Sequence, residues 1–326
     1  MKKGAVLVTG ATGFIGKYVV TYLLDEGLKI FAFIPQGEDH AFLSDKAIEI
    51  VEGDITFPLQ VPAEVSAIYH CAGVIKREEE MERVNVRGTE NVVEAAIAYN
   101  CRLIHLSSAG VVGSTKERVI KEETRCNPDN LYEKTKFRAE EIVMRGVGRG
   151  LKAQILRPTI VFGTGRAPQD DSFLQLIRAI AAGRYRNISG GSGIYNIIYA
   201  GEVARAMSTL DDDAIPNGGT FIINTPVCFS EFASIVLEVA GNSNTKPGNI
   251  PYIAALPAAA IFSLHSLLSH RKKALTFSRL KALTEKRSFS QDRLVSTTSY
   301  RPLHTVQEYL RKVCEEYGIT PHQQPV

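Results

Sequence analysis

The stretch that most constrains this chain is GAVLVTGATGFIG, residues 4–16, close to its first residue. Its apolar run Ala5 to Val8 is typical of a strand buried in a parallel sheet, and the residues after residue 16 repeat apolar side chains at helical spacing. Between strand and helix, Gly10 allows a tight turn, Gly13 allows the backbone to approach a pyrophosphate, and Gly16 allows close packing of the helix. Because a helix start offers free N–H groups and a positive dipole end, this order predicts a dinucleotide site.

Composition places the chain among ordinary globular proteins and argues against several classes of function. Its 326 residues, 44% hydrophobic and 22% charged, suffice for one large α/β domain or two smaller lobes. A net charge of +3 is too small to indicate a nucleic-acid partner. The five cysteines lack CxxC spacing and the seven histidines form no HExxH pair, so we expect reduced thiols, no metal and a cytoplasmic location. We expect no signal peptide, because the first strand directly follows Met1-Lys-Lys.

Apolar runs and helical stretches alternate along the first half of the chain. Strands are predicted at 5–8, 29–34, 47–51, 67–70, 103–106 and 153–156, and helices at 17–25, 81–100 and 129–144. This alternation is typical of a parallel sheet with right-handed crossovers and helices on both faces. Ligands of such sheets bind beyond the carboxyl ends of the strands. The predicted fold class is therefore α/β, a Rossmann-type doubly wound parallel sheet.

The second half of the chain is less regular and predicts a smaller, mostly helical C-terminal substrate lobe. We expect helices at 172–182 and 201–210, strands at 195–199 and 221–224, and mainly helical structure from residue 230 onward. On this basis residues 1–165 form the dinucleotide-binding Rossmann domain and residues 166–326 form the substrate-binding lobe. Residues 194–224 are expected to return to the first domain.

One of the twelve tyrosines has a lysine four residues later, in Tyr132-Glu-Lys-Thr-Lys136. On a helix these positions share a face, and a nearby cation favours the phenolate of a side chain whose ordinary pKa is ~10. Tyr132 is therefore a candidate acid or base. Ser108 ends the preceding strand, where its hydroxyl could meet the phenol. Two structural interpretations stay open: a tyrosine and a lysine on a solvated helix face, and Ser107 and Ser108 capping a turn.

Together these motifs resemble the extended short-chain dehydrogenases/reductases, also called the NAD-dependent epimerase/dehydratase family. The resemblance runs from Val6 to about Tyr309. It is carried by VTGATGFIG (8–16), EGDI (52–55), HCAG (70–73), NVRGTENVVEAA (85–96), HLSSAGVVG (105–113), YEKTK (132–136) and LRPTIVFGTG (156–165). NIIYAGEVARA (196–206) is a weaker match, and residues 288–310 are similar to the family's C-terminal element. The set is specific, whereas any single motif is not.

The resemblance implies how the dinucleotide would be held. Phe14 and Ile15 would offer backbone to the pyrophosphate. Asp54 would accept from the adenine amino group, with Ile55 beside the ring. The residues expected to contact the cofactor are Gly10, Thr12, Gly13, Phe14, Ile15, Gly16, Asp54, Ile55, Ala72, Gly73, Ser107, Tyr132, Lys136, Pro158 and Thr159. Among them, Ala72 and Gly73 would line the ribose path, and Pro158 and Thr159 would flank the nicotinamide.

The resemblance also implies the chemistry, which is hydride transfer between a carbinol carbon and the nicotinamide. Tyr132 would be the base, and Ser108 would bond the reacting oxygen. Lys136 would hold the nicotinamide ribose and lower the pKa of the phenol. Asn85 would bridge backbone between neighbouring elements.

The end of the second strand decides between NAD and NADP in this family. NAD-preferring relatives place Asp there and NADP-preferring ones usually place Arg. Here the residues are Ile34, Pro35 and Gln36, so neither signal is present. Both cofactors stay open, with a slight preference for NADP because no carboxylate would repel a 2′-phosphate.

Departures from the family pattern bear on the substrate. Dehydratases follow the catalytic hydroxyl with Asp-Glu, whereas this chain has Ala109-Gly110, which disfavours elimination of water. Nucleotide-sugar epimerases commonly carry a diphosphate-binding Arg where this chain has Tyr195, although Arg178, Arg184, Arg186 or Arg279 could substitute. Both a sugar nucleotide and a hydrophobic alcohol or ketone therefore remain candidate substrates.

Residues 250–270 contain no Asp, Glu, Lys or Arg and are followed by Arg-Lys-Lys at 271–273. Two prolines, serines and a histidine make this segment a poor membrane-spanning helix. We expect it to close the substrate pocket, with a weak membrane-surface contact through 250–273 as the alternative. With Tyr195, it resembles the sterol-dehydrogenase and flavonol-reductase-like branch of the family.

We expect an enzyme that acts as a homodimer. Three alternatives stay open beside a general oxidoreductase: a nucleotide-sugar 4-epimerase with bound NAD, a sterol- or flavonol-like dehydrogenase or reductase, and a nonenzymatic NAD(P) sensor. The Tyr132/Lys136 pair argues against the sensor, because sensors of this fold often lack it.

Overall fold

The computed structural model describes residues 4–44, 47–166, 171–257, 260 and 277–319. The segment at 250–273, for which a membrane-surface contact is the alternative prediction, lies largely outside these residues. Within them, no helix is both long and apolar enough to cross a membrane.

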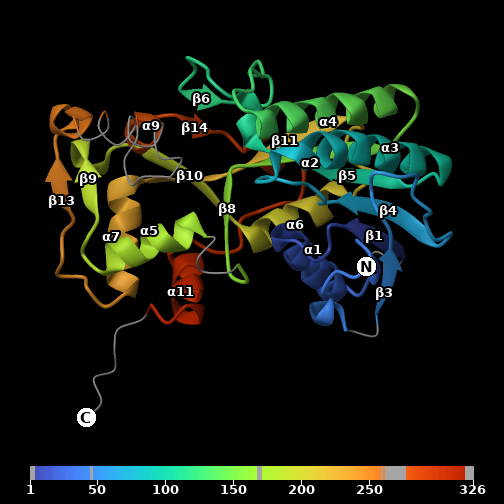
Figure 1. Ribbon diagram of the computed structural model, residues 1–326, viewed down its shortest axis with the longest axis horizontal. Helices are drawn as coiled ribbons and strands as arrows, with labels where there is room; N and C mark the ends of the chain where they lie inside the picture. Colours follow the sequence, from blue (N-terminus) through green and yellow to red (C-terminus); the bar gives the residue numbers. More distant parts are fainter. Residues whose placement is uncertain (1–3, 45–46, 167–170, 258–259, 261–276, 320–326) are drawn as a thin grey trace, which may run out of the picture.

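A seven-stranded parallel sheet forms the centre of the larger part of the molecule (Figure 1). Its strand order is β11-β7-β5-β4-β1-β2-β3. The strands are β1 (Ala5–Thr9), β2 (Lys29–Ile34), β3 (Ile48–Glu52), β4 (Val65–His70), β5 (Arg102–Leu106), β7 (Ala153–Pro158) and β11 (Gly219–Ile223). The chain reverses direction across the sheet between β1 and β4, which is where doubly wound sheets bind ligands. The fold class predicted from the sequence is thus confirmed.

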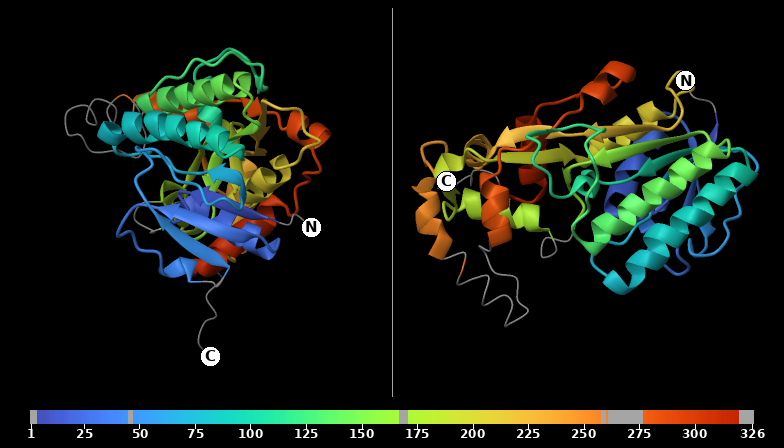
Figure 2. Two further views of the ribbon diagram at one scale, coloured as in Figure 1. Left: turned by 90° about the vertical axis from the view of Figure 1, so that its right-hand side faces the viewer. Right: turned by 90° about the horizontal axis from the view of Figure 1, so that it is seen from above.

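Helices cover both faces of this sheet, because its central strands are apolar on both sides. On one face α1 (Phe14–Asp25) packs against α6 (Ala200–Leu210) over a core that includes Val20, Leu23 and Met207. On the other face α3 (Gly88–Ala98) packs against α4 (Leu131–Gly148) over Val93, Leu103 and Val143. Figure 2 shows α3 and α4, teal and green, together on one side of the sheet.

The helix predicted at 81–100 is not continuous. It divides into α2 (Glu78–Met81), a π-helical turn η2 (Glu82–Arg87) and α3. The π turn contains the buried Asn85, whose side chain bonds elsewhere in the site. A π turn inside a helix is rare and is frequent at functional sites, and periodicity alone does not reveal it.

The remaining elements gather mostly at the end of the molecule away from the N-terminus (Figure 1). They include a three-stranded sheet of order β12-β10-β8, a pair β13-β9 and a pair β14-β6. Their bounds are β6 (Val119–Ile120), β8 (Ile160–Phe162), β9 (Arg186–Ile188), β10 (Ile194–Tyr199), β12 (Thr225–Cys228), β13 (Gly248–Ile250), β14 (Ser288–Phe289), α5 (Ser172–Ala181), α7 (Phe229–Val239), α9 (Phe277–Thr284), α10 (Asp292–Thr297) and α11 (Val306–Glu316), with short 3₁₀ turns η1 (Ala41–Leu43), η3 (Ala109–Val112) and η4 (Ser189–Gly191).

The segment expected to return to the first domain divides between two sheets. β10 joins the three-stranded sheet, whereas α6 and β11 pack with the seven-stranded one. The domain boundary at residue 165 stays a prediction.

Candidate active site

The glycine turn after β1 has the geometry that its sequence predicts. Gly10 has φ +66°, and a Cβ there would lie 2.7 Å from the backbone of Ala72. A Cβ at Gly16 would lie 1.9 Å from the Gly10 carbonyl oxygen, so only glycine fits. At Gly13, where α1 begins, no side chain caps the helix, and the first turn contains no acidic residue. The turn therefore leaves backbone N–H groups for an anion, which fits a dinucleotide pyrophosphate.

A carboxylate reaches this turn from the loop after β2. The Thr12 hydroxyl donates a hydrogen bond of 2.6 Å to Glu38, four residues beyond Ile34. The preference for NADP rested on the absence of any such carboxylate, so the structure removes its basis. Thr12 itself, expected at the cofactor, lies on the turn and holds Glu38 there.

Beyond β4, the chain is held by Asn85. Its Oδ1 accepts from the Val74 N–H at 2.7 Å, and its Nδ2 donates to the Val74 carbonyl at 3.0 Å and to the Thr135 hydroxyl at 3.1 Å. Asn85 thus joins the loop after β4 to α4; it bonds backbone at Val74, as expected, but a side chain at Thr135. Ala72 donates its N–H to the Thr9 hydroxyl, and Gly73 lies beside Asn85, so both are fixed next to the glycine turn.

Asp54 and Ile55 follow β3 at the same edge of the sheet. The Thr56 N–H donates to Asp54 at 2.9 Å, and this bond, aided by Arg83 at 3.5 Å, lowers the pKa of the carboxyl. Asp54 is therefore a charged acceptor at neutral pH. Ile55 is buried against Gly88. Their contact with adenine stays a prediction.

Ser108 and Tyr132 are brought together although 24 positions separate them. Ser108 follows β5, and Tyr132 lies in the first turn of α4, which begins with a capping box between Asn130 and Glu133. Burial raises the pKa of Tyr132 to about 12, and a hydrogen bond with Ser108 opposes this rise. The Ser108 hydroxyl also accepts from the Gly110 N–H at 3.1 Å. At neutral pH Tyr132 is therefore protonated and able to donate a proton.

Lys136 is buried one turn further along α4. Its ammonium donates to the Leu106 carbonyl at 2.6 Å, and burial lowers its pKa to about 8 against the opposing effect of Glu140. We expected Lys136 to lower the pKa of Tyr132. In this structure the opposing effect comes from Ser108 instead, and Lys136 is not among the groups that shift the phenol.

The hydroxyl of Ser107, also expected at the cofactor, is bonded within the protein. It donates to Glu140, which forms a buried ion pair with Arg157 at 2.6 Å. Sequence reasoning missed both partners of this pair. Glu140 stands four residues after Lys136, so their shared helix face was the available signal. The pair joins α4 to β7, and breaking a buried pair typically costs about 3–5 kcal/mol.

Pro158 ends β7, and Thr159 is anchored beside it. The Thr159 N–H donates to the Ile223 carbonyl at 3.2 Å, and its hydroxyl donates to Asn224 at 2.9 Å. Both residues thus lie at the carboxyl edge of the sheet that carries the other site residues. Their contact with a nicotinamide stays a prediction.

Tyr195 belongs to an aromatic cluster. Its ring stacks on Phe229 with centroids 4.7 Å apart and meets Phe232 edge-on at 5.2 Å. Of the substitute cations considered, Arg178 and Arg184 are exposed, Arg186 donates to neighbouring carbonyls, and the side chain of Arg279 lies outside the described residues. At the position of the dehydratase pair, Ala109 is buried and Gly110 lies beside Glu133, whose carboxylate takes part in the capping box of α4.

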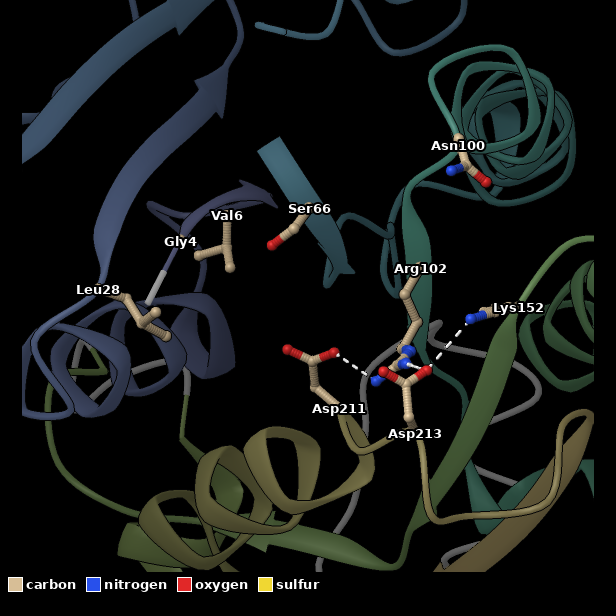
Figure 3. Close-up of a pocket in the computed structure, with 9 residues that line it drawn as sticks. All are labelled: Gly4, Val6, Leu28, Ser66, Asn100, Arg102, Lys152, Asp211 and Asp213. Atoms are coloured by element: carbon tan, nitrogen blue, oxygen red, sulfur yellow. Dashed lines mark hydrogen bonds and ion pairs between the residues drawn. The ribbon is translucent and has the colours of Figure 1, made fainter. Parts of the chain in front are cut away.

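A pocket of about 350 Å³ lies at the opposite edge of the sheet, where the strands begin (Figure 3). Its charged side chains pair with one another. Arg102 bonds Asp211 at 3.0 Å and also bonds Asp213, which in turn accepts from Lys152 at 3.2 Å. These charges compensate each other, and the candidate catalytic residues lie at the other edge.

Among the described residues, no group of His, Cys, Asp and Glu could hold a metal ion.

Two buried histidines that sequence reasoning passed over, His70 and His105, lie with ring centres 5.1 Å apart. Burial lowers the pKa of His70 to about 3 and lowers that of His105 as well, so both are neutral and unsuited to act as general bases near pH 7. The homodimer and the membrane-surface contact stay predictions.

Comparison with known proteins adds an independent line of argument. Residues 6–223 match the model of the NAD dependent epimerase/dehydratase family. The chain is 30% identical over 264 residues to a 3 beta-hydroxysteroid dehydrogenase/Delta 5→4-isomerase of Mycobacterium tuberculosis, covering 73% of this chain and 70% of that protein. It is 27% identical over 265 residues to a 4-hydroxy-2-methyl-3-oxo-4-farnesyl-3,4-dihydroquinoline-1-oxide ketoreductase of Stigmatella aurantiaca, covering 77% and 78%.

A solved structure of similar fold is a UDP-glucose 4-epimerase of Thermotoga maritima with UDP-glucose. It has a TM-score of 0.72 at 17% identity and covers 96% of this chain and 98% of that one. A UDP-glucuronic acid 4-epimerase of Bacillus cereus in complex with NAD has a TM-score of 0.70 at 16% identity, covering 96% and 99%. At these identities the likeness concerns the fold.

Proposed function

The chain belongs to the NAD-dependent epimerase/dehydratase family and is an oxidoreductase or epimerase, and from this premise we propose an NAD-dependent dehydrogenase or reductase of a hydrophobic secondary alcohol or ketone. The observation that carries the proposal is the placement of the Ser108 hydroxyl beside the Tyr132 phenol, one turn from the buried Lys136, whose ammonium the Leu106 carbonyl fixes. These three side chains lie at the sheet edge that also carries the glycine turn. An NAD sensor would not need them.

Bound NAD would accept or supply a hydride at its nicotinamide. Tyr132 handles the proton of the reacting oxygen: its phenol donates the proton to a carbonyl during reduction, and its phenolate accepts the proton from an alcohol during oxidation. Ser108 donates a hydrogen bond to the same oxygen while the Gly110 N–H orients its hydroxyl. Lys136 holds the nicotinamide ribose and is positioned for this by the Leu106 carbonyl.

Apolar surface supports a hydrophobic substrate. Three large apolar side chains at the carboxyl edge of the sheet are exposed. Ile75, in the loop after β4, is 62% exposed. Leu131, the first residue of α4, is 41% exposed, and Ile160, the first residue of β8, is 50% exposed. Apolar side chains on elements at this edge are compatible with an apolar ligand. Tyr195 lies in an aromatic cluster where sugar-nucleotide epimerases carry a cation. The names of the sterol dehydrogenase and the ketoreductase agree with this class.

A substrate panel tests the proposal. We expect NAD reduction with 3β-hydroxysteroids or other bulky secondary alcohols, and no epimerisation of UDP-glucose or UDP-glucuronic acid. The measurement is NADH absorbance, together with chromatography of the sugar nucleotides. Epimerisation without alcohol oxidation would contradict the proposed substrate class, and binding of NADH without turnover of any compound would favour a sensor.

Glu38 supports NAD as the cofactor, because a carboxylate held at the glycine turn accepts from ribose hydroxyls and repels a 2′-phosphate. Replacing Glu38 with Gln should raise kcat/KM for NADP relative to NAD by about tenfold or more, since a like-charge repulsion is removed. The exposed Glu26→Gln at the other end of α1 is the matched control and should leave the ratio unchanged. A wild-type enzyme that prefers NADP, or an unchanged ratio in Glu38→Gln, would remove this role.

A further inference from the structure

Arg166 brings a positive charge to the glycine turn from a distant part of the chain. It follows β8 in the sequence GTGR, and its guanidinium carbon lies 3.6 Å from the ring centre of Phe14. Phe14 is the first residue of α1, directly after Gly13. The charge is thus held beside the uncapped N–H groups that fit a pyrophosphate.

The backbone around Arg166 is clamped on both sides. The Tyr317 hydroxyl donates to the Arg166 carbonyl at 3.0 Å and accepts from its N–H at 3.3 Å. The hydroxyl of Tyr18, on α1, accepts from the Thr164 N–H at 2.7 Å. A side chain whose loop is fixed in this way loses little conformational freedom when it binds a ligand.

The guanidinium N–H groups form no hydrogen bond or ion pair with any residue of the described part of the chain. The nearby carboxylate is Asp171, whose Oδ1 already accepts from the N–H groups of Phe173 and Leu174 at the start of α5. The first turn of α1 contains no acidic residue, and Glu38, the carboxylate at the glycine turn, is bonded by the Thr12 hydroxyl. A half-buried cation with free donors is suited to an anionic ligand.

We propose that Arg166 donates charge-assisted hydrogen bonds to the dinucleotide pyrophosphate, beside the backbone amides of α1. This inference rests on the proposed function, because it assumes the same cofactor site. A phosphate of a sugar-nucleotide substrate would offer the same chemistry, so the test separates the two sources. The family motifs quoted above end at Gly165 and do not include this arginine.

The test measures the affinity for NADH by fluorescence and for ADP-ribose by displacement of NADH. In Arg166→Gln and Arg166→Ala, both affinities should fall about 10- to 100-fold, because a charged hydrogen bond is lost. Arg166→Lys should lose less, since it keeps the charge but not the planar fork. Phe14→Leu should weaken both ligands through loss of the ring beneath the guanidinium. The exposed Arg145→Ala, in the last turn of α4, is the control for loss of one positive charge and should bind as the wild type does.

Several outcomes would overturn the inference. Unchanged affinities in Arg166→Gln and Arg166→Ala would do so, and so would an equal loss in Arg145→Ala. Weaker NADH with unchanged ADP-ribose would place Arg166 at the nicotinamide instead. A raised KM for the substrate alone would assign it to the substrate. If the wild type bound no NADH, the proposed function itself would fail. Thermal unfolding of each variant checks that it is folded. If Arg166→Gln and Arg166→Ala are not folded, the affinities of Arg166→Lys for NADH and ADP-ribose test the inference instead.

Discussion

Replacing Tyr132 with Phe should lower kcat by about 10²- to 10⁴-fold, the usual contribution of a positioned acid or base. The ring would keep its packing, whereas the proton donor that bonds Ser108 would be lost. Because the phenol acts on the substrate oxygen, the affinity for NADH should stay within about twofold. Steady-state kinetics with the alcohol selected from the substrate panel give kcat. NADH fluorescence gives the affinity for NADH.

Tyr99→Phe is the matched control for this variant. Tyr99 is exposed at the end of α3, where its hydroxyl donates to Gln60 at 2.8 Å. Loss of this hydroxyl should change neither kcat nor the affinity for NADH. A kcat for Tyr132→Phe within twofold of wild type would show that Tyr132 is not the acid or base. A parallel loss of NADH affinity would indicate a damaged site.

Replacing Gly16 with Ala should abolish dinucleotide binding and lower the free energy of unfolding by about 3 kcal/mol or more. The new Cβ would lie 1.9 Å from the Gly10 carbonyl oxygen, and this clash is with backbone, so α1 or the turn must move. Urea unfolding measures the stability, and NADH fluorescence measures the binding.

Gly148→Ala is the control, because it stands at the end of α4 with open space around its Cβ position. Its free energy of unfolding should be unchanged or up to about 1 kcal/mol higher, since alanine favours helix more than glycine does. Wild-type NADH affinity in Gly16→Ala would contradict the tight packing of α1 on the turn.

The seven-stranded sheet was largely predictable, since its strands are buried on both faces and appear in the sequence as apolar runs. The prediction for Lys29–Ile34 coincides with β2. The strands β6, β9 and β14 were not predictable, because they are two or three residues long and depend on partners far along the chain. The π turn around Asn85 was not predictable either, because the bonds that hold Asn85 reach Val74 and Thr135, which are distant in the sequence.

The central side chains of the site were predictable because each belongs to a motif with fixed spacing. Ser108 lies just after a strand, and Tyr132 and Lys136 share one helix face. Glu38 and Arg166 carry no such signal, because only the folded loops bring them to the glycine turn. Ser107 was expected at the cofactor from the family resemblance. Its hydroxyl bonds Glu140, which the sequence did not predict, and its contact with the cofactor stays a prediction.

The central claim is hydride transfer at a carbinol carbon with Tyr132 handling the proton. Its most direct test is a single turnover of NAD with a 3β-hydroxysteroid that carries deuterium at carbon 3. We predict that the reduced dinucleotide formed by the wild type contains the deuterium, and that Tyr132→Phe forms almost none in the same time. Reduced dinucleotide without deuterium, or equal formation by the two proteins, would contradict the account.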